Sequence, residues 1–144
     1  MMHRLEVTNP FDGSPVGEVR LASASEVDAA VAIAEKIHKA NKQGIPKHER
    51  IAVLKNTAKI MKGKADELAL LIASEGGKPL IDAKVEVERA IDGVETCAAE
   101  IANNAGMEIP MDLTLAGAGK IAFTTKGPIG IVVAVSAFNH PLNL

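Results

Sequence analysis

Residues 127–141 read Gly-Pro-Ile-Gly-Ile-Val-Val-Ala-Val-Ser-Ala-Phe-Asn-His-Pro, and this stretch decides the fold class. The segment from Ile129 to Val135 is apolar at nearly every position and rich in β-branched residues. Such a run is typical of a strand covered on both faces, as the central strands of parallel sheets are. The sequence therefore predicts an α/β protein in which a buried strand leads directly into a polar loop at Asn139.

A buried strand of this kind needs neighbouring strands. Parallel strands are joined by crossovers of about a dozen residues or more, and only three residues follow Pro141. We therefore expect the chain to be the front part of a larger protein, with an incomplete sheet.

The composition is that of a globular domain. Its 144 residues are 47% hydrophobic and carry a formal net charge of -2, with both signs interspersed, so we expect neither a nucleic-acid nor a membrane partner. The N-terminal residues lack the apolar core of a signal peptide, which favours a cytoplasmic location. The single cysteine, Cys97, allows no internal disulfide and no zinc site by itself, so no metal site is predicted.

The N-terminal part of the sequence predicts a β-hairpin followed by a helix. Two extended segments within residues 6–21 flank the run 9–15, in which Pro, Asp and Gly supply the backbone angles of turns. Ser25, followed three residues later by Asp28, resembles a capping box, and apolar residues then recur at helical spacing to about Asn41.

Three more helices are predicted before a half-exposed strand at 121–125, which precedes the buried strand at 129–135. The second helix begins at Pro46, and its buried stripe consists of Ile51, Leu54, Ala58 and Met61. A third helix, carried by Leu68, Leu71 and Ile72, ends at Gly76-Gly77, because glycine accepts the left-handed conformation that closes helices. The long helix from Pro79 to about Asn104 has an apolar stripe formed by Leu80, Ala83, Val87, Ala90, Val94, Cys97 and Ile101.

Three motifs follow one another along this framework. They are Asn9–Gly13 after the first strand, Glu75–Leu80 followed by Glu86–Arg89 in the long helix, and residues 127–131 leading into 137–141. In this order and spacing they resemble the N-terminal part of the NAD(P)-dependent aldehyde dehydrogenase superfamily. The resemblance covers nearly the whole chain. It implies an N-terminal part of the NAD(P)-binding domain at 1–109, an assembly (oligomerisation) hairpin at 110–126 and the truncated start of a Rossmann-like sheet at 127–144.

The resemblance also implies a catalytic residue and a cofactor-binding stretch. Asn139 matches the family's catalytic asparagine, whose amide N–H stabilises the anion formed when a cysteine thiolate attacks an aldehyde. The alternative is a loop asparagine that bonds its own backbone. Residues Val135, Ser136, Ala137 and Phe138 are implied to contact NAD or NADP, because open α/β sheets bind ligands at the carboxyl ends of their strands. Core packing is the alternative, above all for Val135.

Several other residues receive less specific interpretations. The sequence departs from the family loop Pro-Trp-Asn-Phe-Pro at Ala137, Phe138 and His140, and a space-filling His140 is favoured over one that transfers protons. Cys97 is predicted to be a core residue, not the nucleophile. Lys78 is interpreted as a helix-capping residue, whereas Glu86, Glu88 and Glu95 are interpreted as parts of a solvated helix face.

The resemblance implies that the parent protein oxidises an aldehyde to a carboxylic acid with NAD or NADP, through a cysteine thiohemiacetal. The implied assembly is a homodimer or homotetramer, and the loop is most similar to those of members acting on small polar or phosphorylated aldehydes. The family's nucleophile and general base normally lie after this part, so the chain alone should be inactive. The alternative is a non-catalytic helical or assembly module from a truncated gene.

Overall fold

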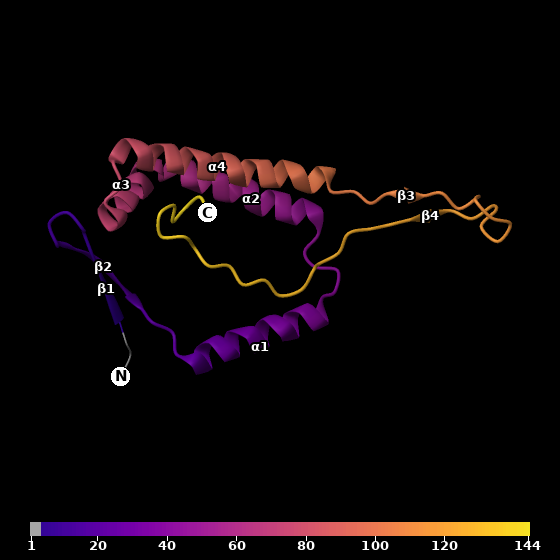
Figure 1. Cartoon of the computed structure of the whole chain (residues 1–144), viewed down its shortest axis with the longest axis horizontal. Coiled ribbons are helices and arrows are strands. Elements are labelled where there is room, and N and C mark those ends of the chain that lie inside the picture. Colours follow the sequence, from indigo (N-terminus) through magenta and orange to yellow (C-terminus); the bar gives the residue numbers. More distant parts are fainter. Residues whose placement is uncertain (1–3) are drawn as a thin grey trace.

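The computed structural model describes residues 4–144, and Figure 1 shows three parts within them. Helices α2, α3 and α4 pack together as a helical body, α1 lies apart from it, and β3 and β4 form a long projecting arm. The elements are β1 (Arg4–Thr8), β2 (Pro15–Arg20), α1 (Ala24–Ala40), α2 (Lys47–Gly63), α3 (Ala65–Gly76), α4 (Leu80–Asn103), β3 (Glu108–Ile109) and β4 (Ala122–Phe123). None of the helices in residues 4–144 is long and apolar enough to cross a bilayer.

The predicted N-terminal hairpin is confirmed, but the cap of α1 lies two residues earlier than expected. Strands β1 and β2 pair antiparallel, with Leu5 opposite Val19. Ser23, not Ser25, caps α1, because Glu26 at the third helical position reaches back to the Ser23 N–H at 2.8 Å and completes the capping box. This bond and the hydrogen bonds from the Arg20 and Ser23 side chains lower the pKa of Glu26 to about 2. Helix α1 buries no residue.

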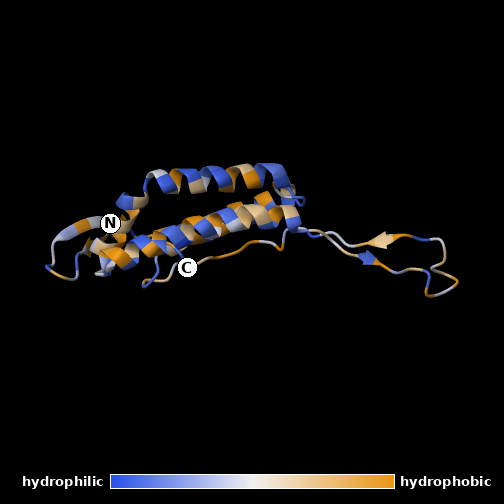
Figure 2. Cartoon of the chain, turned by 90° about the horizontal axis from the view of Figure 1, so that it is seen from above, coloured by the Kyte–Doolittle hydropathy of each residue, from blue (hydrophilic) through white to orange (hydrophobic). Residues whose placement is uncertain are grey.

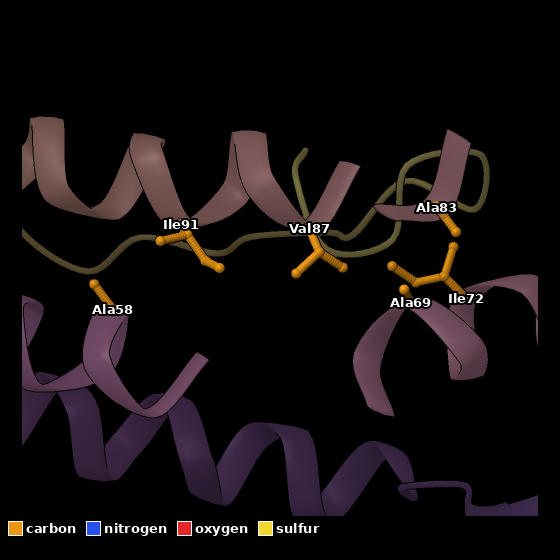
Figure 3. Close-up of a cluster of buried hydrophobic side chains, with 6 residues drawn as sticks. All are labelled: Ala58, Ala69, Ile72, Ala83, Val87 and Ile91. Atoms are coloured by element: carbon orange, nitrogen blue, oxygen red, sulfur yellow. The ribbon is translucent and has the colours of Figure 1, made fainter. Parts of the chain in front are cut away.

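The core of the chain lies between α4 and the pair α2 and α3. Figure 3 shows Ala83, Val87 and Ile91 of α4 facing Ala58 of α2 and Ala69 and Ile72 of α3. Eight apolar residues are buried among the residues that the structure describes. Three of them are Ile72, Val87 and Ile91, and the other five are alanines. Small side chains let the helix axes approach closely, so the core is thin and depends on few large groups.

The C-terminal half of α4 corrects the sequence prediction for Cys97. Cys97 is exposed, and its neighbour Ala98 is buried instead. Both positions fit a spacing of three or four residues from Val94, so periodicity alone does not separate them. The predicted stripe is otherwise buried or half-buried from Ala83 to Val94.

The turn between α3 and α4 forms as predicted. Gly77 adopts the left-handed conformation with φ +66°, and its N–H donates to the Ala73 carbonyl at 3.0 Å. A Cβ at this position would also come within 2.9 Å of the Pro10 ring. Glycine is therefore required here, and the turn places Lys78 at the start of α4.

The predicted buried strand at 129–135 does not form in this structure. These residues are extended coil, and Ile129 and Val135 are 94% and 89% exposed. In residues 4–144 the strands form only the pairs β1–β2 and β3–β4, so nothing lies beside this segment to pair with it. Figure 2 shows the segment as an uncovered, largely hydrophobic chain running toward the C-terminal end. Its sequence is suited to a sheet that these residues do not themselves supply.

Replacing Val87 with alanine tests the thin core. Val87 is 1% exposed, so V87A should lower the free energy of unfolding by about 2 kcal/mol, through lost burial and the cavity left behind. Urea unfolding followed by circular dichroism at 222 nm measures the change. The control V85A lies on the same helix at 40% exposure and should change the free energy by less than about 0.5 kcal/mol. Equal effects would contradict this assignment of the core.

Candidate functional site

The loop at residues 139–143 returns to the helical body and lies against it. Figure 1 shows the C-terminal end of the chain beside α4 and α2. Leu142 packs against the core cluster, and the Ser136 hydroxyl donates to the Pro141 carbonyl at 2.9 Å. The predicted site residue Asn139 is therefore part of a loop that is folded onto the helices.

Glu86 is the buried charged residue at this contact, which corrects its interpretation as part of a solvated helix face. Its side chain is 1% exposed. Its Oε2 accepts from the Lys78 ammonium, and its Oε1 accepts from the Leu142 N–H at 3.0 Å. The signal in the sequence was its spacing, because a residue three positions after Ala83 falls on the apolar stripe. Glu88 and Glu95 are exposed, as predicted.

Lys78 connects this carboxylate to the loop, and it is not a helix cap. Its ammonium also donates to the main-chain carbonyl of Asn139 at 2.6 Å and lies 3.3 Å from His140 Nδ1. An ammonium has three N–H donors, so these partners use its full capacity. The N-cap of α4 is Pro79, without a side-chain cap.

His140 lies on the open side of this cluster. Its Nδ1 is 3.3 Å from Lys78 Nζ and 3.5 Å from Glu86 Oε2. A neutral imidazole with its proton on Nε2 accepts from Lys78, whereas a protonated imidazole donates to Glu86. The imidazole therefore makes polar contacts that a purely space-filling role does not include.

The cluster holds the Glu86 carboxylate in its charged form. Burial raises the pKa of this carboxyl, but the hydrogen bonds from Lys78 and from the Leu142 N–H outweigh burial, so the pKa lies below its usual value. Lys78 and Glu86 thus form a buried ion pair at neutral pH. Such pairs are costly to desolvate and strongly destabilising to break on one side.

Asn139 lines an open groove of about 720 Å³. Among residues 4–144, the hydrogen bond found for Asn139 is the one that its main-chain carbonyl accepts, and none involves its side-chain amide. Its main-chain carbonyl, in contrast, is fixed by Lys78. The other residues that line the groove are Val7, Pro10, Ile72, Glu75, Gly76, Lys78, Pro79, Asp82, Phe138 and Pro141.

The predicted cofactor stretch is only partly brought to this groove. Phe138 lines it at 93% exposure, whereas Val135 is exposed away from it. The Ser136 hydroxyl is used by the Pro141 carbonyl, and Ala137 is half-buried. Of the four residues, Phe138 alone lines this groove.

The arrangement of hairpin, helical body, arm and polar loop is that of aldehyde dehydrogenases, of which the chain forms an incomplete part. Aldehyde dehydrogenase 21 from Physcomitrella patens, in complex with the reaction product succinate, matches with a TM-score of 0.91 and 34% identity, over 99% of this chain and 30% of that one. An NADP-dependent glyceraldehyde-3-phosphate dehydrogenase from Bacillus halodurans, complexed with NADP, matches with a TM-score of 0.88 and 30% identity, over 98% and 30%.

The sequence comparisons agree with this fold. Residues 2–144 match the aldehyde dehydrogenase family, and the chain belongs to that family. Aspartate-semialdehyde dehydrogenase 1 of Pseudomonas canavaninivorans is 36% identical over 140 residues, which are 97% of this chain and 30% of that protein. The resemblance stated from the motifs is therefore confirmed, and the chain spans about 30% of the length of such relatives.

The charge of Glu86 predicts a pH dependence of stability. Because its pKa in the folded chain lies below the ordinary value of 4.5, its contribution is complete above about pH 4.5 and is lost as the pH falls through the folded-state pKa. The urea midpoint of the wild type should therefore exceed that of E86Q at pH 7, and the difference should shrink toward pH 3. Glu26 is present in both proteins, so its titration cancels. A difference that stays constant with pH would contradict the buried charge.

Proposed function

We propose that this chain supplies the oxyanion donor and part of the cofactor wall of an NAD(P)-dependent aldehyde dehydrogenase. The reaction is the oxidation of an aldehyde to a carboxylic acid through a cysteine thiohemiacetal, with the dinucleotide as hydride acceptor. The observation that carries the proposal is the state of Asn139. The main-chain carbonyl of Asn139 accepts from Lys78 at 2.6 Å, whereas its side-chain amide makes no hydrogen bond to the residues that the structure describes, and the residue borders a groove.

The chemistry requires a donor of this kind. Attack of a thiolate on an aldehyde converts the carbonyl oxygen into an anion, which must be stabilised by a donor that is already in place. The Asn139 amide offers N–H groups without a titratable charge, so its donor capacity does not depend on pH. The Asn139 amide does not have to break a hydrogen bond with the described residues before it donates to the oxyanion.

Other parts of the proposal concern the complete protein. We assign the nucleophile and the general base to residues outside this chain, because the resemblance implies that they lie after this part of the protein. Residues 135–138 would form a cofactor wall once neighbouring strands cover 129–135, and NAD and NADP both remain candidates. The relatives named above include enzymes of small polar and phosphorylated aldehydes, which supports that substrate class. We also propose a cytoplasmic homodimer or homotetramer.

A second candidate is a non-catalytic assembly module, and the exposed arm favours it. Leu113 and Leu115, between β3 and β4, are 81% and 98% exposed. Exposed apolar groups of this kind mark contact surfaces. The proposed assembly hairpin at 110–126 would serve either candidate, so catalysis has to be tested directly.

The 144-residue chain should be inactive by itself. Without a nucleophile, the purified chain should give no aldehyde-dependent increase in absorbance at the NAD(P)H wavelength with lactaldehyde, glyceraldehyde 3-phosphate or succinate semialdehyde. The product of the complete gene in which this sequence lies serves as the comparison, and it should show turnover. Turnover by the 144-residue chain would overturn the placement of the nucleophile, and an inactive gene product would favour the assembly module.

Replacing Asn139 with alanine in that gene product tests the oxyanion donor. The variant N139A should lower kcat by about 10²–10³-fold, because one oxyanion donor is removed, and it should change KM little. Steady-state kinetics in NAD(P)H absorbance measure both constants. N143A is the matched control, since Asn143 belongs to the same loop but does not line the groove. A kcat for N139A equal to that of N143A would refute the role of Asn139.

A further inference from the structure

We propose that Glu86, acting through Lys78, is a positioning residue that holds Asn139 at the groove. This inference rests on the proposed function in treating Asn139 as catalytic. The geometry that carries it is a chain of contacts from the core of the helical body to the backbone of the loop. Neither Glu86 nor Lys78 needs to touch substrate in this role.

The two oxygens of one carboxylate fix the loop at two points. Oε2 binds the Lys78 ammonium, which in turn binds the Asn139 carbonyl at 2.6 Å. Oε1 binds the Leu142 N–H at 3.0 Å. The loop is therefore held at the Asn139 carbonyl and at the Leu142 N–H, three residues later. Two contacts fix both the distance of the loop from α4 and its orientation.

The same two side chains also contact His140, the residue after Asn139, whose Nδ1 lies 3.3 Å from Lys78 Nζ and 3.5 Å from Glu86 Oε2, and few other contacts hold this loop to the helical body. The preceding residues 129–135 are exposed coil, and the bonds from Ser136 to Pro141 and from Leu144 to His140 lie within the segment itself. Leu142 adds an apolar contact with the core, but it lies on the far side of the turn from Asn139. The position of Asn139 therefore depends mainly on Lys78.

A second ion pair of the helical body, which does not contact the loop, serves as a comparison for the Lys78–Glu86 pair. Lys62 and Glu95 join α2 to α4 at 2.6 Å, with side chains 56% and 46% exposed. The side chains of Lys78 and Glu86 are 18% and 1% exposed. Exposed pairs contribute little, whereas a buried pair is retained in some proteins because it fixes one arrangement. The Lys62–Glu95 pair is thus a matched control, because Glu95 lies on the same helix as Glu86.

A purely structural role for Glu86 makes a different prediction. If the ion pair served only to stabilise the first turns of α4, its loss would loosen residues 80–90 at least as much as the loop. A positioning role predicts that the loop loosens while α4 stays ordered, because α4 retains Val87, Ile91 and its other core contacts.

Hydrogen exchange followed by mass spectrometry separates these roles in the 144-residue chain at pH 7. In E86Q and K78M, peptides covering 139–144 should exchange about 10-fold faster than in the wild type, and peptides covering 80–90 should change much less, by no more than the loss of global stability that urea unfolding measures. K78R keeps the charge and donors and should restore most of the protection, whereas E95Q should match the wild type. Unchanged exchange in 139–144, or an equal increase in 80–90, would overturn the inference.

Kinetics of the complete gene product give the second readout. E86Q should lower kcat by about 10- to 100-fold with little change in KM, since a donor displaced by about 1 Å loses most of its effect. K78R should recover part of kcat, and E95Q should behave as the wild type. An unchanged kcat in E86Q would also overturn the inference. An inactive wild-type product would instead overturn the proposed function, and hydrogen exchange on the chain would still decide whether Glu86 holds the loop.

Discussion

The buried carboxylate of Glu86 is the constraint on which the C-terminal half of the structure depends. A charge placed on the apolar stripe of α4 must be neutralised and fully hydrogen-bonded, because desolvation of an unpaired carboxylate is too costly. Lys78 satisfies one oxygen and the Leu142 N–H satisfies the other. Lys78 follows the α3–α4 turn and Leu142 belongs to the C-terminal loop. The hydrogen bonds of the Glu86 carboxylate therefore join this turn to the loop.

The helical part of the fold could be predicted because its signals are local. The positive φ of Gly77 and the stripe through Ala83 and Val87 follow from chain neighbours a few residues apart. The strand at 129–135 could not be obtained in the same way, because a strand exists only when another strand pairs with it. Its composition predicted a buried strand that the structure does not form, and the described residues contain no strand paired with it.

The site was predicted unevenly for a similar reason. Asn139 stays a prediction from its motif. The groups that hold its backbone were misassigned, because Lys78 and Glu86 look like an ordinary turn lysine and a surface glutamate when each is taken alone. Their pairing across 8 residues becomes visible only when the turn at Gly77 is formed. Position 86 on the stripe was the available signal. A charged residue at a core position predicts a partner, even where the sequence does not name it.

The contacts that hold Asn139 do not depend on strand pairing at 129–135. The groups that fix Asn139 all lie at or after residue 139 or within 78–86, and none of them belongs to the unpaired segment 129–135. The loop can therefore take its place on the helical body before any strand pairs with that segment. Strand pairing would then act on a loop whose backbone Lys78 and Glu86 already hold. If Asn139 is the oxyanion donor that we propose, the helical body sets its position, and strands paired with 129–135 would enclose it.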